Sequence, residues 1–330
     1  MAVEYITVSQ SEDGMRLDKW FKVFYPDLNF IQLQKKCRKG EVRIDSKRAK
    51  CGDRVEKGNV IRIPPLGKME KPKSVLSDKV YNSEDAEFIR QMIVYKDDGV
   101  IALNKPAGLA AQGGSNTDKH IDGLSRYLHR DGQDKPRLVH RLDKDTSGVM
   151  LMAKTRKVAS QLMEAFKNQK PRKIYWAIVV GQPEVSKGTI DMPLSKKTVG
   201  KAEKVVIDEE EGKRAVTEFE VLYRLGGVLT VVALWPKTGR THQLRAHMAY
   251  TGTPILGDGK YGGNEAFVSD DKHSKQVHLH ARSITIPDNV DGTRGGTVIT
   301  ADLPKHILQT FEAWGVEGTL SSFDKAFEDI

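Results

Sequence analysis

The segment that constrains this chain most is a short polar loop that runs directly into an apolar strand. Residues 140–148 read His-Arg-Leu-Asp-Lys-Asp-Thr-Ser-Gly, and the five residues that follow, 149–153, are all apolar. Such a run is long enough for a buried strand. A buried strand can fix the backbone of the loop while one polar side chain of the loop enters a pocket. A solvated charged turn is the alternative interpretation, and Asp143 is the residue of this loop that we single out.

Composition bounds the class of protein. The 330 residues suit two domains with a full hydrophobic core, and 38% hydrophobic with 29% charged residues is typical of a soluble globular protein. No apolar run reaches membrane length and the first residues form no signal peptide, so we expect no membrane partner. The two cysteines, Cys37 and Cys51, form no CxxC pair. A disulfide between them stays open, but this pattern favours a reduced, cytoplasmic protein.

Positive charge is concentrated near the N-terminus. Residues 1–75 carry 17 Lys and Arg against 10 Asp and Glu, whereas the rest of the chain carries 36 against 34. Positive charge gathered on a small segment favours a polyanionic partner, most simply a nucleic acid. A solvated basic surface without a partner explains the charge equally well, so the charge supports nucleic-acid binding without deciding it.

The N-terminal segment has the pattern of two short helices followed by a small sheet. Residues 14–25 place large apolar side chains on one helical stripe. Asn29 can cap a second helix, which stops at Gly40, and its exposed positions are rich in Lys and Arg. Alternating strands follow over residues 42–63.

The boundaries of the domains follow from composition. After Pro64 the chain is rich in Pro, Lys and Ser, which is typical of a linker, and Ser83 can cap a short helix near its end. We therefore predict a small N-terminal α/β domain over 1–70, a linker over 71–92 and a second domain over 93–330.

The second domain is predicted to be rich in strands. The segment 173–181 is β-branched and aromatic, and its period of two places Lys173, Tyr175 and Ala177 on one face. The other predicted strands cover residues 100–103, 215–223, 228–235 and 277–286, and the predicted helices include 241–250 and the segment after Pro304. Many strands with few helices between them indicate an α+β fold built on a mixed, mainly antiparallel sheet.

Three motifs point to other functions and are set aside. Residues 257–262 match GxGxxG, but a dinucleotide loop needs a strand before it and a helix after it, and we expect a turn there without a following helix. Residues 140–143 transpose the kinase catalytic loop, but the chain has no Asp-Phe-Gly motif. His242 and His247 would point about 140° apart on a helix, so they cannot form a two-histidine metal face. We expect no metal site.

Four segments together resemble a known enzyme family. They are residues 140–148, 173–181, 237–247 (Lys-Thr-Gly-Arg-Thr-His-Gln-Leu-Arg-Ala-His) and 279–281 (Leu-His-Ala), and they occur in this order. This combination resembles the pseudouridine synthases of the RluA/RluC/RluD type over residues 93–287. The resemblance implies that the protein converts chosen uridines of RNA to pseudouridine without a metal, a nucleotide cofactor or any other cofactor.

The N-terminal segment adds a second resemblance. Residues 16–18, 39–42 and 52–55 resemble the alpha-L RNA-binding motif found in a small-subunit ribosomal protein. With such a domain in front of the catalytic one, the chain is most similar to the RluC and RluD branch of the family. That branch implies large-subunit ribosomal RNA as the substrate.

The resemblance also implies roles for three catalytic residues. Asp143 matches the catalytic aspartate, which can act as a nucleophile at C1′ of the ribose or as a base at C2′. Arg245 matches the arginine that pairs with this aspartate, and such a pair would keep Asp143 ionised. Tyr175 matches the tyrosine that packs against the base and can take the C5 proton.

Three further residues are predicted to bind the RNA. Arg141 can fill the space that the extruded nucleotide leaves in the RNA, because extrusion costs a few kcal/mol and benefits from a replacement contact. Arg240 lies at the start of the predicted helix and can meet an RNA phosphate, and Leu279 matches an apolar residue that lines the pocket.

Two other classes of function compete with this prediction. The chain could be an RNA-binding or ribosome-assembly factor whose catalytic domain has lost its activity, but Asp143, Tyr175 and Arg245 are all present. A metal-dependent nucleic-acid hydrolase is the third class, and the sequence offers no ligand set for it. The sequence does not identify the modified uridines, the oligomeric state or the choice between the two roles of Asp143.

Overall fold

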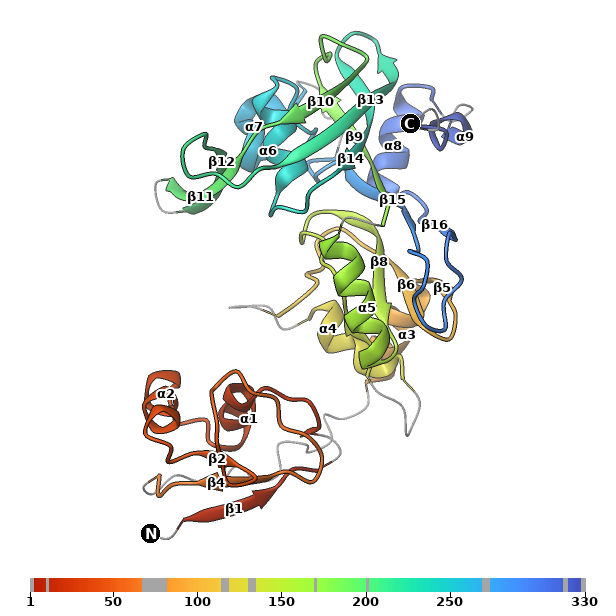
Figure 1. Ribbon diagram of the computed structural model, residues 1–330. Helices are drawn as coiled ribbons and strands as arrows, with labels where there is room; N and C mark the ends of the chain where they lie inside the picture. Colours follow the sequence, from red (N-terminus) through yellow and green to blue (C-terminus); the bar gives the residue numbers. More distant parts are fainter. Residues whose placement is uncertain are drawn as a thin grey trace. The chain divides into compact units, whose positions relative to one another are not determined.

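The computed structural model divides into two compact units, Met1–Tyr81 and Asn82–Ile330 (Figure 1). The residues that the structure describes are 3–9, 12–66, 82–113, 119–129, 135–168, 171–199, 202–268, 274–316 and 320–327. Each unit has its own hydrophobic core. Among the described residues, every helix is too short or too polar to span a lipid bilayer.

The N-terminal unit consists of two helices and a four-stranded antiparallel sheet. The helices are α1 (Leu17–Phe24) and α2 (Phe30–Arg38). The sheet has the order β1 (Glu4–Thr7), β4 (Val60–Ile63), β2 (Arg43–Ile44) and β3 (Lys47–Arg48). The predicted order of two helices before a small sheet is confirmed for these segments, although β1 precedes both helices and was not predicted.

Local sequence explains the two helices of this unit. The side chain of Asn29 accepts a hydrogen bond from the backbone N–H of Gln32, and the Gln32 side chain accepts one from the backbone N–H of Asn29, so the predicted cap of α2 is a complete capping box. Trp20 and Phe21 of α1 are fully buried, and Trp20 donates a hydrogen bond to the carboxylate of Glu12. The apolar stripe predicted for α1 therefore forms the core of the unit.

The predicted linker over 71–92 needs a correction at its C-terminal end. Residues 83–91 form helix α3 (Ser83–Gln91), and Ala86 and Ile89 of this helix are fully buried in the core of the second unit. The cap is Asn82, whose side chain accepts a hydrogen bond from the backbone of Asp85, rather than the predicted Ser83. The helix itself was predicted, but the linker range was drawn over it, so the second unit begins earlier than the predicted boundary at residue 93. The part of the predicted linker before Asn82 lies outside the described residues.

The second unit is built on a ten-stranded sheet. Its strands are β5 (Ile93–Lys96), β6 (Val100–Lys105), β7 (Arg137–Leu138), β8 (Ser147–Ala153), β9 (Lys173–Val180), β10 (Lys187–Asp191), β13 (Val216–Leu225), β14 (Leu229–Pro236), β15 (Leu279–Thr285) and β16 (Val298–Thr300). A separate two-stranded sheet is formed by β11 (Leu194–Val199) and β12 (Ala202–Ile207). The helices beside α3 are α4 (Ile121–Leu124), α5 (Arg156–Lys167), α6 (Gln243–Tyr250), α7 (Gly259–Gly262), α8 (Lys305–Ala313) and α9 (Leu320–Phe323).

The sheet has the strand order β10-β13-β14-β9-β15-β8-β6-β5. Among the strand pairs of the described residues, β8 with β15 alone is parallel, and the others are antiparallel. The predicted α+β class with a mixed, mainly antiparallel sheet is confirmed.

Strand β8 is buried on both faces, which explains why its sequence is apolar without alternation. Leu151 and its alternate neighbours pack against α5, which runs along β8 in Figure 1. Met150 and Met152 face the opposite way and pack in the core that contains α3 and α4. A strand covered on both faces reads as a continuous apolar run. The loop before β8 is therefore attached to a strand that cannot shift without disturbing two cores.

Gly148 makes the parallel contact between β8 and β15 possible. Ser147 pairs with His280 and Gly148 with Ala281, and Gly148 has a φ of +111°. A Cβ atom at this position would overlap the backbone of Ala281. Only glycine combines this backbone conformation with so close an approach.

We expect Gly148→Ala to lower the free energy of unfolding by roughly 3 kcal/mol or more, since it adds a steric clash to backbone strain. Gly108→Ala is the matched control, because Gly108 has a φ of +85° but open space around it, so only the strain of roughly 1–2 kcal/mol applies. Urea unfolding of both variants measures the difference. Equal losses would show that the approach to Ala281 is not limiting.

Candidate active site

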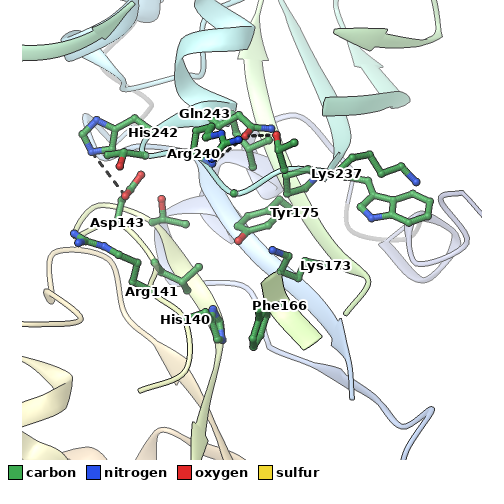
Figure 2. Close-up of a pocket in the computed structure, with 18 of the residues that line it drawn as sticks. His140, Arg141, Asp143, Phe166, Lys173, Tyr175, Lys237, Arg240, His242 and Gln243 are labelled. Atoms are coloured by element: carbon green, nitrogen blue, oxygen red, sulfur yellow. Dashed lines mark hydrogen bonds and ion pairs between the residues drawn. The ribbon is translucent and has the colours of Figure 1, made fainter. Parts of the chain in front are cut away.

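A cavity of about 480 Å³ lies in the second unit (Figure 2). Its walls come from the loop before β8, from β9, from the end of α5, from the segment between β14 and α6, and from the start of β15. All six residues that the sequence singled out line this one cavity: Arg141, Asp143, Tyr175, Arg240, Arg245 and Leu279. The structure therefore brings together segments that are far apart in the chain.

The loop before β8 is held by a half-buried histidine. His140 accepts a hydrogen bond at Nε2 from the backbone N–H of Leu151, at 2.8 Å, and its ring stacks on Phe166 of α5 with the centroids 4.7 Å apart. Burial lowers the pKa of His140 to about 3, and the nearby charge of Lys173 acts in the same direction. The ring is therefore neutral near pH 7, as an acceptor must be.

Lys105 holds the other side of the same loop. Its ammonium is fully buried and donates to the backbone carbonyls of Pro106, Leu109 and Lys144, at 2.8, 2.8 and 3.1 Å. Burial lowers the pKa of Lys105 to about 8, against the attraction of the Asp145 and Asp143 charges. The sequence analysis missed Lys105, whose only signal was a lysine at the end of an apolar strand.

The strand after the loop is fixed by a third hydrogen-bonded pair. Ser147 Oγ lies 2.9 Å from Nδ1 of His280, and Nε2 of His280 lies 3.1 Å from the carbonyl oxygen of Ala301. Because a carbonyl can only accept, Nε2 carries the proton and Nδ1 accepts from the serine hydroxyl. Burial lowers the pKa of His280 to about 4, so this neutral tautomer is the stable one.

Tyr175 enters the cavity from β9. It pairs with Ala281 of β15 on one side and with Leu234 of β14 on the other, so its backbone lies in the middle of the sheet. Burial raises the pKa of Tyr175, and the charge of Asp143 raises it further. The phenol is therefore protonated at neutral pH, and it presents an aromatic face and an O–H donor to the cavity.

The segment before α6 forms the wall opposite the loop. His242 has a left-handed backbone conformation, with a φ of +50°, and its Nδ1 lies 2.7 Å from the hydroxyl of Tyr261. Its Nε2 lies 3.7 Å from Oδ1 of Asp143, as the dashed line in Figure 2 shows. Burial lowers the pKa of His242, so the contact is that of a neutral ring with a carboxylate. The sequence analysis noted His242 but gave it no role.

Gln243 braces this wall. Its side-chain carbonyl accepts hydrogen bonds from the hydroxyl of Thr238 and from the backbone N–H of Arg240, and its amide donates to the backbone of Val216. A single buried amide therefore ties the turn before α6 to β13. Gln243 lies in the motif 237–247 that the sequence analysis quoted, but the sequence alone gave it no role, because its partner on β13 is 27 residues away.

The direct hydrogen-bond partner of Arg245 is Asp258, and the predicted pairing with Asp143 stays a prediction. Arg245 is buried and donates two hydrogen bonds of 2.7 Å to the carboxylate of Asp258, which is 1% exposed. Its nearest ion pair with the loop is to Asp145, at 3.6 Å, and Asp143 acts on it only by longer-range attraction. The two oxygens of Asp258 face two parallel N–H donors of the guanidinium, and such a bidentate pair is stronger than a single contact.

Asp258 lies in the GxGxxG segment that the sequence analysis set aside. The segment itself forms one short helical turn, α7 (Gly259–Gly262), and a single 3-10 turn, Gly263–Ala266, follows it, so it lacks the long helix that a dinucleotide loop needs. Asp258 caps α7 by accepting a hydrogen bond from the backbone of Tyr261. One carboxylate therefore caps α7 and neutralises Arg245.

The charges that line the cavity are mostly positive. They comprise six Lys and Arg side chains, Arg141, Lys167, Lys173, Lys237, Arg240 and Arg245. Asp143 is the single carboxylate among the described residues that line it. Arg141 and Arg240 are exposed at the rim, where Arg240 donates to the backbone of Arg214. The described residues contain no group of three metal-ligating side chains.

This arrangement is suited to a polyanionic substrate, and comparison with known proteins identifies the family. Residues 99–250 match the family model described as RNA pseudouridylate synthase. A ribosomal large subunit pseudouridine synthase C from Rickettsia typhi is 36% identical over 282 residues, covering 84% of this chain and 90% of the relative. The chain belongs to the RNA pseudouridine synthase family and is an isomerase, as the sequence motifs predicted.

Two further relatives and one solved structure support the same family. Proteins with the same name from Salmonella typhi and Escherichia coli K12 are 34% and 36% identical, covering 94% and 80% of this chain and 96% and 81% of the relatives. The structure of human RNA pseudouridylate synthase domain containing 4 superposes with a TM-score of 0.58 at 28% identity, covering 70% of this chain and 95% of that one. The fold of the second unit is therefore shared with known members.

We expect Asp258→Asn to lower the free energy of unfolding by about 3–5 kcal/mol, because it leaves the buried Arg245 without its counter-charge. Asp145→Asn is the matched control, since Asp145 is half-exposed and its pair with Arg245 is longer, so a loss of about 0–1 kcal/mol is expected. Urea unfolding measures both. A larger loss for Asp145→Asn would mean that Asp145, and not Asp258, stabilises the arginine.

Proposed function

We propose that this pseudouridine synthase modifies uridines of large-subunit ribosomal RNA and that Asp143 acts on the ribose of the target uridine. The relatives from Rickettsia typhi and Salmonella typhi are ribosomal large subunit synthases by name, and their similarity spans 84% and 94% of this chain. The observation that carries the role of Asp143 is that, of the residues that the structure describes, it is the single carboxylate lining a cavity rich in cations. A ribosomal substrate makes the cytoplasm the compartment of action.

The reaction needs a carboxylate at the sugar and a pocket for the base. The N1–C1′ bond breaks, the uracil turns, C5 bonds to C1′, and the C5 proton leaves. Asp143 can attack C1′ or remove a proton from C2′, and both routes require an ionised carboxylate. The side chain of Asp143 is 19% exposed, so a substrate can reach it.

The other lining residues suit the roles that the family motifs predict. Leu279 is buried and offers an apolar wall, and the ring of Tyr175 offers a face on which a base can pack. Because the phenol of Tyr175 is protonated, it can take up the C5 proton only after it has passed its own proton on. Arg141 and Arg240 at the rim suit contacts with the RNA strand from which the base has been extruded.

The N-terminal unit is proposed to be an alpha-L RNA-binding domain. Helix α2 carries Lys35, Arg38 and Lys39 on exposed positions. The ion pair of Lys39 with Glu41 is long, at 3.9 Å, and Arg38 donates a hydrogen bond to the uncharged side chain of Gln34. Neither cation is therefore closely neutralised, and both can contact a phosphate. Exposed cations that follow one helix are an electrostatic footprint for RNA.

We expect Asp143→Asn to abolish turnover while leaving RNA affinity and the fold nearly unchanged, because the amide keeps the size but can be neither nucleophile nor base. Pseudouridine formation in large-subunit ribosomal RNA transcripts measures the turnover, and filter binding measures the affinity. Asp145→Asn, two residues along the same loop, controls for the loss of a charge. If Asp143→Asn keeps turnover within tenfold of wild type, another group carries out the reaction. If the wild-type protein is inactive on these transcripts, large-subunit ribosomal RNA is not its substrate.

We expect the triple variant Lys35→Gln, Arg38→Gln, Lys39→Gln to weaken RNA binding and to flatten its dependence on salt. Each lost phosphate contact lowers the slope of log K against log salt by about one. The binding constant is measured between low and physiological salt, with circular dichroism as a check on the fold. An unchanged slope would mean that these three cations face solvent in the complex.

A further inference from the structure

One partly buried cation of the cavity, Lys173, has neither a hydrogen bond nor an ion pair in the part of the chain that the structure describes. Lys173 is the first residue of β9, two residues before Tyr175, so both side chains leave the same face of the strand. Figure 2 shows the Lys173 ammonium beside the Tyr175 ring, inside the cavity, and both residues line it. Lys173 is partly buried, unlike the exposed arginines at the rim.

No carboxylate of the residues that the structure describes forms an ion pair with Lys173. Its ammonium makes a cation–π contact with the ring of Phe166, whose centroid lies 5.4 Å from Nζ. His140 is neutral, Tyr175 is protonated, and burial lowers the pKa of Lys173. An ammonium held in this way lacks the hydration of free lysine and gains from any anion that enters.

The other cations of the cavity are differently placed. Lys237 lies 3.3 Å from the carboxylate of Glu218 and 2.9 Å from the centre of the Trp235 ring. Arg245 is neutralised by Asp258. An uncompensated cation beside the tyrosine is therefore a particular feature of Lys173 and not of the cavity as a whole.

The reaction generates an anion at this place. When the N1–C1′ bond breaks, its electron pair leaves with N1, so the detached uracil carries a negative charge spread over N1 and its carbonyl oxygens. The same electron pair then forms the C5–C1′ bond, C5 loses its proton, and N1 gains one, so the overall change is an isomerisation. A base that packs on Tyr175 would hold this charge within reach of the neighbouring side chain on β9.

We propose that the Lys173 ammonium stabilises the uracil anion that forms when the glycosidic bond breaks, which makes Lys173 a catalytic residue. This inference rests on the proposed function, in which Asp143 acts on the ribose and the base packs on Tyr175. A charged donor aimed at developing charge in a site shielded from water lowers the barrier more than the energy of the ground state. A backbone phosphate is the other anion of RNA, but the exposed Arg141 and Arg240 at the rim are better placed for it.

The test compares two substrates whose bases differ in acidity. Fluorine at C5 withdraws electrons and stabilises the detached base, so a transcript with 5-fluorouridine at the target needs less help from a cation. We expect Lys173→Met to slow the single-turnover rearrangement of uridine roughly 10²–10³-fold. The loss on 5-fluorouridine should be at least tenfold smaller, measured as the disappearance of the target nucleoside, and the Kd for RNA should hardly change.

Further measurements on Lys173 variants distinguish a catalytic role from a structural role. Lys173→Arg keeps the charge and should recover part of the rate on uridine. Lys173→Met should not lower the melting temperature, since it removes a partly buried charge without a partner, whereas a structural lysine would leave its acceptors unpaired. Should the methionine variant fail to fold, Lys173→Gln provides the same comparison of substrates with a polar side chain.

Lys237→Met is the matched control, because it removes a lysine of the same cavity that already has a carboxylate partner. It should slow both substrates by the same factor. The proposal is overturned if Lys173→Met slows uridine and 5-fluorouridine equally, if its effect lies only in the Kd for RNA, which would indicate a phosphate contact, or if it has no effect. Failure of the ribosomal assignment is distinct, because it appears as an inactive wild-type protein on ribosomal transcripts.

Discussion

The close contact of β8 with β15 is the constraint on which the catalytic unit depends. Gly148 lies against the backbone of Ala281, and this parallel contact joins β5, β6 and β8 to the antiparallel strands β9, β14, β13 and β10. The cavity opens beside this joint. Asp143 comes from one part of the sheet and Tyr175 from the other, so the distance between them is set by the packing of β15.

Hydrogen bonds and ion pairs outside the cavity hold its walls in place. The loop that carries Asp143 is held by the ammonium of Lys105 and by the ring of His140, and the opposite wall is held by Gln243 and by the pair of Arg245 with Asp258. Each of these groups is buried or backed by a core, and each uses its polar atoms on the protein. The residues that face the cavity are thereby left with few internal bonds and are available to a substrate.

Sequence reasoning succeeded where a pattern is local. The alternation of β9 correctly placed Lys173 and Tyr175 on one face, the capping residue Asn29 correctly marked the start of α2, and motif resemblance identified the family. It failed where no regular helix or strand spacing relates a residue to its partner. Nothing near Arg245 indicates that its carboxylate is Asp258 rather than Asp143, and a lysine such as Lys105 has no pattern that reveals its three carbonyl acceptors.

The parallel contact of β8 with β15 also bears on when the site can form during folding. Ser147 and His280, which meet at the joint, are 133 residues apart in the chain. Contacts across such a separation close late, because the entropy of the intervening chain must be overcome first. The hairpins on either side can form early from their own sequences, but the cavity has no wall at Leu279 until β15 enters between them. The active site is therefore among the last parts of the unit to assemble.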